Sequence, residues 1–452
     1  MSTRSVILAS LVLLAARAGA ENGWTSLFNG RNLDGWVQLN GTALYVVESG
    51  QLVGRCVGGS PNSFLCTTKE FGDFIFECET KIDWSLNSGV QFRSEARPDL
   101  RKGRVYGYQI EIDATDRAWT GGIYDESRRG WLHTLEAQES SRKAFQADGW
   151  NKLRIEAIGT SIRTWVNGVP CADIRDGQTL RGFFGLQVHS IENDSTRVGK
   201  TVRWRNLRVM TEGLERYRTP EDPSIPQYNF VPNTLSEREK KAGWRLLWDG
   251  KSFDGWRGAR LDQFPKGGWE IADGALTVLE SGGRESTAGG DIVTTGTYAG
   301  FELSVEFSIT PGANSGIKYF VDTELNKGEG SAIGCEYQIL DDVSHPDAAL
   351  GVNGNRKLSG LYDLIPPVNV RFNGVGEWNR AKILAKGKHV EHWLNGFKTV
   401  DYERATQMWR ALVSHSKYVV WPAFGEASRG HILLQDHGNR VSFRSIKIRT
   451  LD

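Results

Sequence analysis

A repeated set of motifs constrains this chain more than any other feature of its sequence. An opening that ends in Asp-Gly-Trp returns after about 220 residues, and the later motifs return in the same order. The matched segments are 23–30 and 243–250, 33–36 and 253–256, 87–89 and 314–316, 150–151 and 378–379, 165–168 and 393–396, and 187–189 and 435–437. Since a fixed order at nearly fixed spacing marks duplication, the sequence predicts two copies of one domain.

Proline-rich residues 220–226 separate the copies, with Pro232 shortly after. Proline cannot donate to a β-ladder, so we expect this segment to act as a linker outside the sheets. The predicted order is a signal peptide at 1–20, a first domain at 21–212, a linker at 213–240 and a second domain at 241–452. Residues 235–242 are expected to form a short helical turn.

Within each copy, apolar residues alternate with polar ones at a period of two. Residues 301–309 alternate without a break, 74–82 do nearly the same, and 383–394 read as a hairpin turning at Gly387. The sequence contains 52 glycines and 16 tryptophans, which suits many short strands joined by tight turns. The pattern predicts an all-β, two-sheet sandwich in each half.

Composition and the N-terminus limit the partners. The net charge of +1 removes the electrostatic argument for nucleic acid or an anionic membrane. Residues 6–16 form a short apolar run after Arg4, ending in small residues at 18–20, which is typical of a signal peptide and too short to span a bilayer. We therefore expect a secreted or periplasmic protein without a transmembrane anchor; its oligomeric state is open.

Polar residues occupy one parity of several predicted strands, and this places them in rows on one sheet face. Amides, carboxylates and basic groups in such a row can grip a hydroxyl-rich ligand, although a solvated outer face is the alternative interpretation. The candidate residues of the first copy are Gln91, Arg93, Gln109, Glu111, Asp113, Gln187 and His189. Those of the second copy are Lys318, Glu336, Gln338, Asp341, Gln435 and His437, with Phe320 in the place of Arg93.

The motif set as a whole resembles the 3-keto-disaccharide hydrolase family, and the resemblance covers nearly all of the chain after residue 20. It implies tandem concanavalin-like jelly rolls that act on glycosides oxidised at C3. A ketone at C3 acidifies the C2 hydrogen, so a base can start an elimination that releases the aglycone, and hydration completes a net hydrolysis. Such a reaction needs a base, an acid and a group that stabilises the enolate oxygen.

Parity and chemistry suggest roles for these residues. Glu111 and His189 are the acid–base candidates of the first copy, with Arg93 and Gln109 on the enolate oxygen, and Glu336 and His437 take the acid–base roles in the second. The remaining candidates are expected to bind substrate: Gln91, Asp113, Gln187, Lys318, Gln338, Asp341 and Gln435.

Several alternatives stay open. A lectin-like protein could use the same rows without catalysis. A conventional retaining glucanase would use Glu111, Asp113 and Asp116, which nearly match an E-x-D-x-x-E strand. A long insertion near residues 345–357 argues against equal sites and could bring His345 into the second one.

The remaining expectations concern cofactors and disulfides. No cofactor is expected, although a divalent cation near Asp341, Asp342 and His345 is an alternative. Cys78 is predicted to lie in the core, whereas Cys56 and Cys66 could pair.

Overall fold

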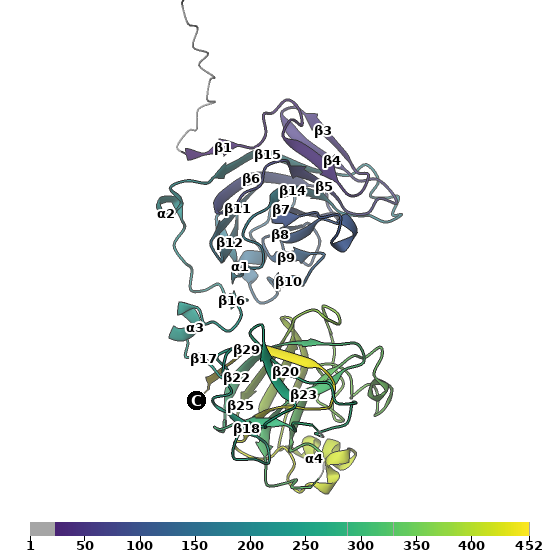
Figure 1. Cartoon of the computed structure of the whole chain (residues 1–452). Coiled ribbons are helices and arrows are strands. Elements are labelled where there is room, and N and C mark those ends of the chain that lie inside the picture. The colour runs from purple at the N-terminus through teal and green to yellow at the C-terminus, as the bar shows by residue number, and fades with distance from the viewer. Residues whose placement is uncertain (1–22, 287, 329, 452) are drawn as a thin grey trace, which may run out of the picture.

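A computed structural model describes residues 23–286, 288–328 and 330–451. The predicted signal peptide lies outside these residues. The chain forms two β-sandwiches, one above the other in Figure 1, and the segment that carries α2 (Leu214–Tyr217), β16 (Gln227–Asn229) and α3 (Glu237–Lys241) runs between them. The architecture is all-β, with two tandem jelly-roll sandwiches, as the alternation and the resemblance predicted.

The first domain packs a large sheet against a smaller one. In spatial order the large sheet contains β16, β13 (Val169–Arg175), β12 (Ser161–Val166), β11 (Asn151–Ile158), β6 (Phe74–Ile82), β15 (Thr201–Met210), β4 (Gln51–Arg55) and β3 (Leu44–Glu48), with β1 (Thr25–Ser26) on β15. The smaller sheet contains β10 (Gly130–His133), β9 (Ile123–Glu126), β8 (Tyr106–Asp113), β7 (Asn87–Glu95), β14 (Phe183–Val188), β5 (Ser63–Thr67) and β2 (Trp36–Leu39). A short helix, α1 (Glu139–Arg142), lies in one connection.

The second domain repeats this plan. Its large sheet contains β19 (Trp269–Ala272), β20 (Ala275–Val278), β29 (Val441–Thr450), β22 (Phe301–Ile309), β25 (Asn379–Lys386), β26 (His389–Leu394) and β27 (Phe397–Glu403), with β17 (Arg245–Leu246) on β29. Its smaller sheet contains β18 (Trp256–Gly258), β21 (Ile292–Thr294), β28 (His431–Leu434), β23 (Asn314–Asp322) and β24 (Ile333–Leu340). The longest helix of the described chain, α4 (Gln407–Ser414), belongs to a loop of this domain.

The predicted parity holds through most of the strands. Tyr108, Ile110 and Ile112 of β8 pack in the core of the first domain, so the alternate residues of that strand face outward. The predicted strands at 74–82 and 301–309 are β6 and β22, and the predicted hairpin is β25 and β26. Across the described residues, no helix combines the length and apolar character needed to cross a bilayer.

The linker differs from its prediction in one respect. Directly after Pro226, β16 pairs in parallel with β13 at the edge of the large sheet, so part of the linker does join a sheet. This is compatible with the nearby prolines because β16 itself contains none and occupies an edge. The predicted helical turn is α3, which Ser236 and Glu239 close with a reciprocal capping box.

Candidate active site

The first domain carries a chain of hydrogen-bonded side chains across β7 and β8. Ser94 Oγ donates to Gln91 Oε1 (2.8 Å), and Gln91 Nε2 donates to Gln109 Oε1 (2.8 Å). Gln109 Nε2 then donates to Glu111 Oε2 (3.1 Å), and Asn87 Nδ2 donates to Glu111 Oε1 (2.5 Å). The predicted row of Gln91, Gln109 and Glu111 is therefore present, and its members saturate one another.

Arg117 lies at the end of this row, just after β8, and no sequence pattern singled it out. Its Nη2 donates to Glu111 Oε1 (2.6 Å) and its Nε donates to Asp113 Oδ2 (2.7 Å). Its guanidinium also lies 5.1 Å from the Trp119 ring centroid and 5.0 Å from that of Trp131. Burial raises the pKa of Glu111 to about 7, although Arg117 acts in the opposite direction.

Gln187 and His189 end the row at β14. Gln187 Nε2 donates to Glu126 Oε2 (3.4 Å), while Gln187 Oε1 is buried without a partner. His189 follows the strand, is exposed, and directs its Nδ1 to the carbonyl of Ser190 (2.8 Å). Desolvation and the charge of Arg117 lower the pKa of His189.

Arg93 does not lie with this row, so its predicted place was wrong. A β-bulge between Phe92 and Glu95 breaks the alternation, and Arg93 adopts a left-handed φ of 44°. Its fully buried guanidinium donates to the carbonyls of Gly72 (2.9 Å) and Gly159 (2.8 Å) and to Asp73 (2.8 Å). Arg93 therefore holds one end of the sandwich together.

In the second domain, Arg404, which directly follows β27, takes the place of the Arg93 guanidinium. Phe320 has the matching φ of 52°, and the guanidinium of Arg404 lies 3.8 Å from its ring centroid. Arg404 donates to the carbonyl of Gly387, in the hairpin turn that corresponds to the turn at Gly159, at 3.2 Å from its Nη2. The change from Arg93 to Phe320 is thus a structural exchange, and it does not distinguish the chemistry of the two domains.

Strand register fixes which row residues correspond. Gly89 pairs with Glu111 and Gln91 with Gln109, whereas Gly316 pairs with Gln338 and Lys318 with Glu336. A Cβ on Gly89 would meet Gln109, and one on Gly316 would meet Glu336, which supports the same correspondence. Glu111 therefore corresponds to Gln338 and Gln109 to Glu336, so amide and carboxylate exchange places between the domains.

The row of the second domain leaves polar atoms free. Gln338 Nε2 donates to Asn314 Oδ1 (3.3 Å), and Asn314 Nδ2 lies 3.3 Å from His437 Nε2. This direction makes His437 Nε2 an acceptor and places the ring proton on Nδ1. Among the described residues, His437 Nδ1, Gln338 Oε1 and Gln435 Oε1 are buried and have no partner. Three such atoms in one row are available to a ligand, since buried polar atoms are nearly always hydrogen-bonded.

Charged groups line the deeper part of this row. Lys318 Nζ lies 3.5 Å from Glu336 Oε2 and contacts Ser331, which in turn contacts Asp291. Burial would lower the pKa of Lys318, but the carboxylates of Glu336 and Asp291 outweigh it and raise the pKa. Gln435 Nε2 donates to Glu285 Oε1 (2.8 Å) in the neighbouring loop.

Asp341 falls outside the row, because β24 ends at Leu340 and the alternation ends with it. Its carboxylate accepts from the backbone N–H groups of Gly312 (2.8 Å) and Val343 (3.1 Å), and these bonds lower its pKa against the opposing effect of burial. Asp341 therefore fixes the turn that leads into the insertion and is not placed to bind substrate.

The insertion brings His345 to the row. Its ring centroid lies 6.1 Å from that of His437, at an interplanar angle of 86°. His345 Nδ1 accepts from the N–H of Asp347 (3.1 Å), which leaves the proton on Nε2. Arg356 holds the insertion in shape by binding Asp347 (2.9 Å) and Asp363 (2.7 Å).

A second insertion, residues 404–430, adds Lys417 beside the row. Its ammonium lies 4.3 Å from the Tyr362 ring centroid. Desolvation and the charge of Lys318 lower the pKa of Lys417, while Glu336 opposes the change. The sequence carried a signal for this insertion, because the spacing from the Asn-Gly turn to the Gln-x-His motif doubles in the second copy.

Two further expectations are corrected, and one is confirmed. Asp116 is exposed and follows β8, which ends at Asp113, so it does not continue the carboxylate row that a retaining glucanase needs. Cys56 and Cys66 are free, as are the other three cysteines, and Cys78 lies in the core as predicted.

The predicted cation candidates do not converge. Asp341 binds backbone amides, and Asp342 accepts from the N–H of Leu358 (2.9 Å). Elsewhere in the described chain, His389, Glu391 and Asp401 lie close enough together to hold an ion. Lys398 already binds both of those carboxylates, at 3.2 and 2.6 Å.

Comparison with known proteins identifies the family of the chain. The family of the 3-keto-alpha-glucoside-1,2-lyase-like domain matches residues 23–210 and 243–449. The chain belongs to this family. It carries two tandem copies of the domain and is an enzyme of the glycoside hydrolase type.

Individual relatives match about half of the chain. A 3-keto-disaccharide hydrolase of Bacteroides thetaiotaomicron is 38% identical over 230 residues, covering 46% of this chain and 79% of that protein. Two crystal structures of candidate glycosyl hydrolases from Parabacteroides distasonis are also similar. One is 31% identical with a TM-score of 0.43, covering 49% of this chain and 100% of the other, and the second is 25% identical with a TM-score of 0.36, covering 46% and 99%.

Proposed function

We propose that this protein hydrolyses 3-keto-glycosides by elimination and hydration, and that the second domain carries out the reaction. The observation that carries the proposal is the set of buried, unpartnered atoms of Gln338, Gln435 and His437. Two amide oxygens accept from sugar hydroxyls, and one imidazole N–H donates to a sugar oxygen. The row of the first domain leaves one such atom among the described residues, Gln187 Oε1, because Arg117 binds Glu111 and Asp113.

The residues of this row can supply each proton transfer. Glu336 removes the C2 proton, and the electron pair moves to the C3 oxygen as an enolate. As the enolate collapses, the C1–oxygen bond breaks and the leaving oxygen takes the proton from His437 Nδ1. Water then adds across the new double bond, which makes the net reaction a hydrolysis.

The enolate needs a positive neighbour, and Arg93 has no part in this. Lys318 is held by Glu336 and Ser331 deep in the row. Lys417 lies at the open side, over the ring of Tyr362. We assign the stabilisation of the enolate oxygen to Lys417.

Matched amide variants of the two domains test the assignment. With a nitrophenyl 3-keto-glucoside as substrate, Glu336→Gln should lower kcat by about 10²- to 10⁴-fold, the range of general acid–base catalysis, because it removes the base. Glu111→Gln should stay within about threefold of the wild type. The reverse result would move the reaction to the first domain.

The same assay separates the alternatives. Cleavage of the unoxidised nitrophenyl glucoside at a similar rate would indicate a conventional glycosidase. Binding of the 3-keto substrate without any release of nitrophenol would indicate a lectin-like protein.

We also propose export to the periplasm or medium, on the basis of the signal-peptide pattern at residues 1–20. N-terminal sequencing of the protein from the extracytoplasmic fraction should find a chain that begins near Glu21. A chain that still begins at Met1 and stays with the cytoplasm would contradict this proposal.

A further inference from the structure

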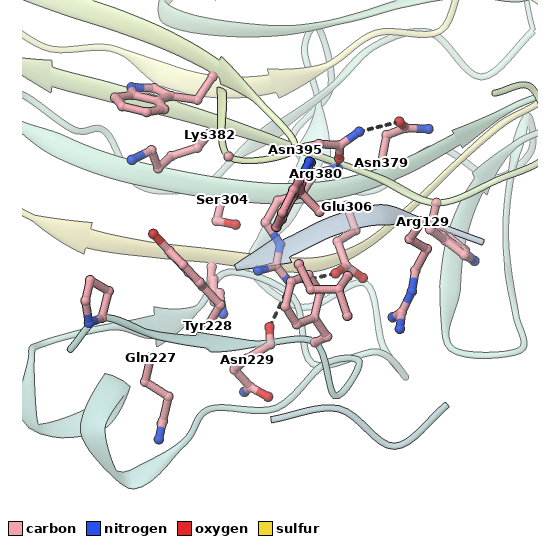
Figure 2. Close-up of a pocket in the computed structure, with 18 of the residues that line it drawn as sticks. Arg129, Gln227, Tyr228, Asn229, Ser304, Glu306, Asn379, Arg380, Lys382 and Asn395 are labelled. Atoms are coloured by element: carbon pink, nitrogen blue, oxygen red, sulfur yellow. Dashed lines mark hydrogen bonds and ion pairs between the residues drawn. The ribbon is translucent and has the colours of Figure 1, made fainter. Parts of the chain in front are cut away.

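A cavity of about 340 Å³ lies between the two domains; its lining includes Trp131, which Arg117 contacts, but none of the row residues themselves. Its walls are β10 of the first domain, the linker around β16, and the outer face of the large sheet of the second domain. Figure 2 shows Tyr228 extending from the linker toward the sheet that carries Ser304 and Lys382. The volume falls in the range of about 300–1,000 Å³ that small-molecule sites occupy.

Most charges in this wall are already paired with one another. Glu306 accepts from Arg380 (2.8 Å) and Arg444 (2.8 Å). Glu302 is bound by Arg449 (2.8 Å), and Glu239 forms an ion pair with Lys447. These pairs use all three carboxylates of the wall, whereas its lysines and arginines outnumber them, so the wall offers a ligand donors and no free carboxylate.

Several hydrogen-bonding atoms are left free around the cavity. Gln227 Oε1 and Arg380 Nε, the latter in a charged guanidinium, are buried and have no partner among the described residues. The hydroxyls of Tyr228 and Ser304 form no hydrogen bond with another described residue, and both line the cavity. Two hydroxyls, one acceptor and one donor are complementary to several hydroxyls of a ligand.

Aromatic side chains complete the wall. Trp131, Tyr228 and Trp393 all line the cavity, and Tyr228 is 41% exposed, so solvent reaches this side. Lys382 lies over Trp393, with its ammonium 4.1 Å from the ring centroid. Aromatic rings beside free hydrogen-bonding groups suit a molecule with an apolar ring face and polar edges.

We propose that this interdomain cavity binds a saccharide unit at a site separate from the reacting row. The cavity lies on the large sheet of the second domain, whereas the row lies on its smaller sheet. A glycan held here is tethered to the enzyme while a different sugar reacts. The proposal does not depend on which domain reacts.

Calorimetric titration of trehalose and cellobiose into the full chain tests the site. The double variant Tyr228→Phe/Ser304→Ala removes two hydroxyls and no packing atoms, so it should fold as the wild type does. We expect its Kd for the preferred disaccharide to rise at least about tenfold, the effect of losing about 1.4 kcal/mol in hydrogen bonds. Tyr217→Phe, an exposed tyrosine on α2, is the control and should change nothing.

Activity distinguishes this site from the row. The double variant should keep kcat and KM for the nitrophenyl 3-keto-glucoside within about twofold, while Glu336→Gln should leave disaccharide binding intact. Equal Kd values for the wild type and the double variant, or no binding of either disaccharide, would overturn the proposal.

Discussion

The two domains share a scaffold and differ in how they satisfy the same polar face. In the first domain, both Asn87 and Arg117 donate hydrogen bonds to the carboxylate of Glu111. In the second, the corresponding Asn314 faces His437, and buried acceptors remain free. Among the described residues, the first face leaves one buried atom without a partner, Gln187 Oε1, whereas the second leaves three.

This difference depends on an exchange of two neighbouring side chains. Glu336 occupies the position that Gln109 has in the first domain. Its cross-strand neighbour is Lys318, where the first domain has Gln91. The vacated position holds Gln338, whose amide orients Asn314 and through it His437. The exchange of amide and carboxylate along β24 thus leaves the imidazole of His437 without a structural role.

The strongest test of the comparison is a matched pair of histidine variants. His437→Gln should lower kcat for the 3-keto substrate by about 10²- to 10⁴-fold, because it removes the proton donor of the open row. His189→Gln should remain within about threefold, since His189 is exposed and bound to the carbonyl of Ser190. Steady-state kinetics of the two variants measure this, and similar losses in both would mean that the domains react alike.

Arginine variants sharpen the structural side of the comparison. Arg93→Met and Arg404→Met each remove a buried guanidinium that holds backbone carbonyls at the end of a sandwich. Each should destabilise its own domain by about 2–4 kcal/mol, visible as one shifted transition in scanning calorimetry. The kcat of the folded protein should not change. If Arg93→Met instead lost turnover at normal stability, Arg93 would have a catalytic role.

Alternation predicted the row residues that lie within regular strands. Gln109 and Glu111 of β8 and Gln187 of β14 face outward because a strand presents alternate residues to opposite faces. Period two also gave the core residues Tyr108, Ile110 and Ile112. The sequence repeat then predicted that the fold occurs twice.

The prediction failed where the backbone leaves regular geometry. The bulge at Arg93 and the end of β24 before Asp341 both change the direction of a side chain without any sign in the alternation. Arg117 and Lys417 lie on loops, and their positions depend on tertiary contacts with Trp131 and Tyr362. The two copies share the letters Tyr-Gln-Ile at residues 108–110 and 337–339. Aligning these letters misplaces the carboxylate, because strand pairing shifts the correspondence by two residues.

The pH dependence of stability tests whether the row of the first domain is structural. The pKa of Glu111 is about 7 in the folded protein and about 4.3 in an unfolded chain. The folded state therefore binds more protons between these values, and this carboxyl makes stability fall as pH rises from about 4.3 to 7. Glu111→Gln should be about 4 kcal/mol more stable than the wild type at pH 8 and nearly equal at pH 4.5.

Calorimetry of the first-domain transition across this pH range measures the effect. Asp116→Asn is the control, because Asp116 is exposed and should give no pH-dependent difference. A variant that is less stable than the wild type at pH 8 would show that the ion pair with Arg117 outweighs the cost of burial.

The smallest expected effect concerns His345, which the first domain lacks. His345→Asn keeps an acceptor for the N–H of Asp347 and so preserves the turn, but it removes the imidazole beside His437. We expect kcat to fall about three- to tenfold, on the order of 1 kcal/mol, because one wall of the open row loses a donor.

Desolvation and His437 lower the pKa of His345, so wild-type His345 gains its charge only in acid. The acid limb of the kcat profile should therefore become shallower in the variant, whereas His415→Asn, on an exposed histidine at the end of α4, should leave the profile unchanged. An unchanged rate and profile in His345→Asn would mean that the insertion only covers the row, and that the open row alone distinguishes the second domain.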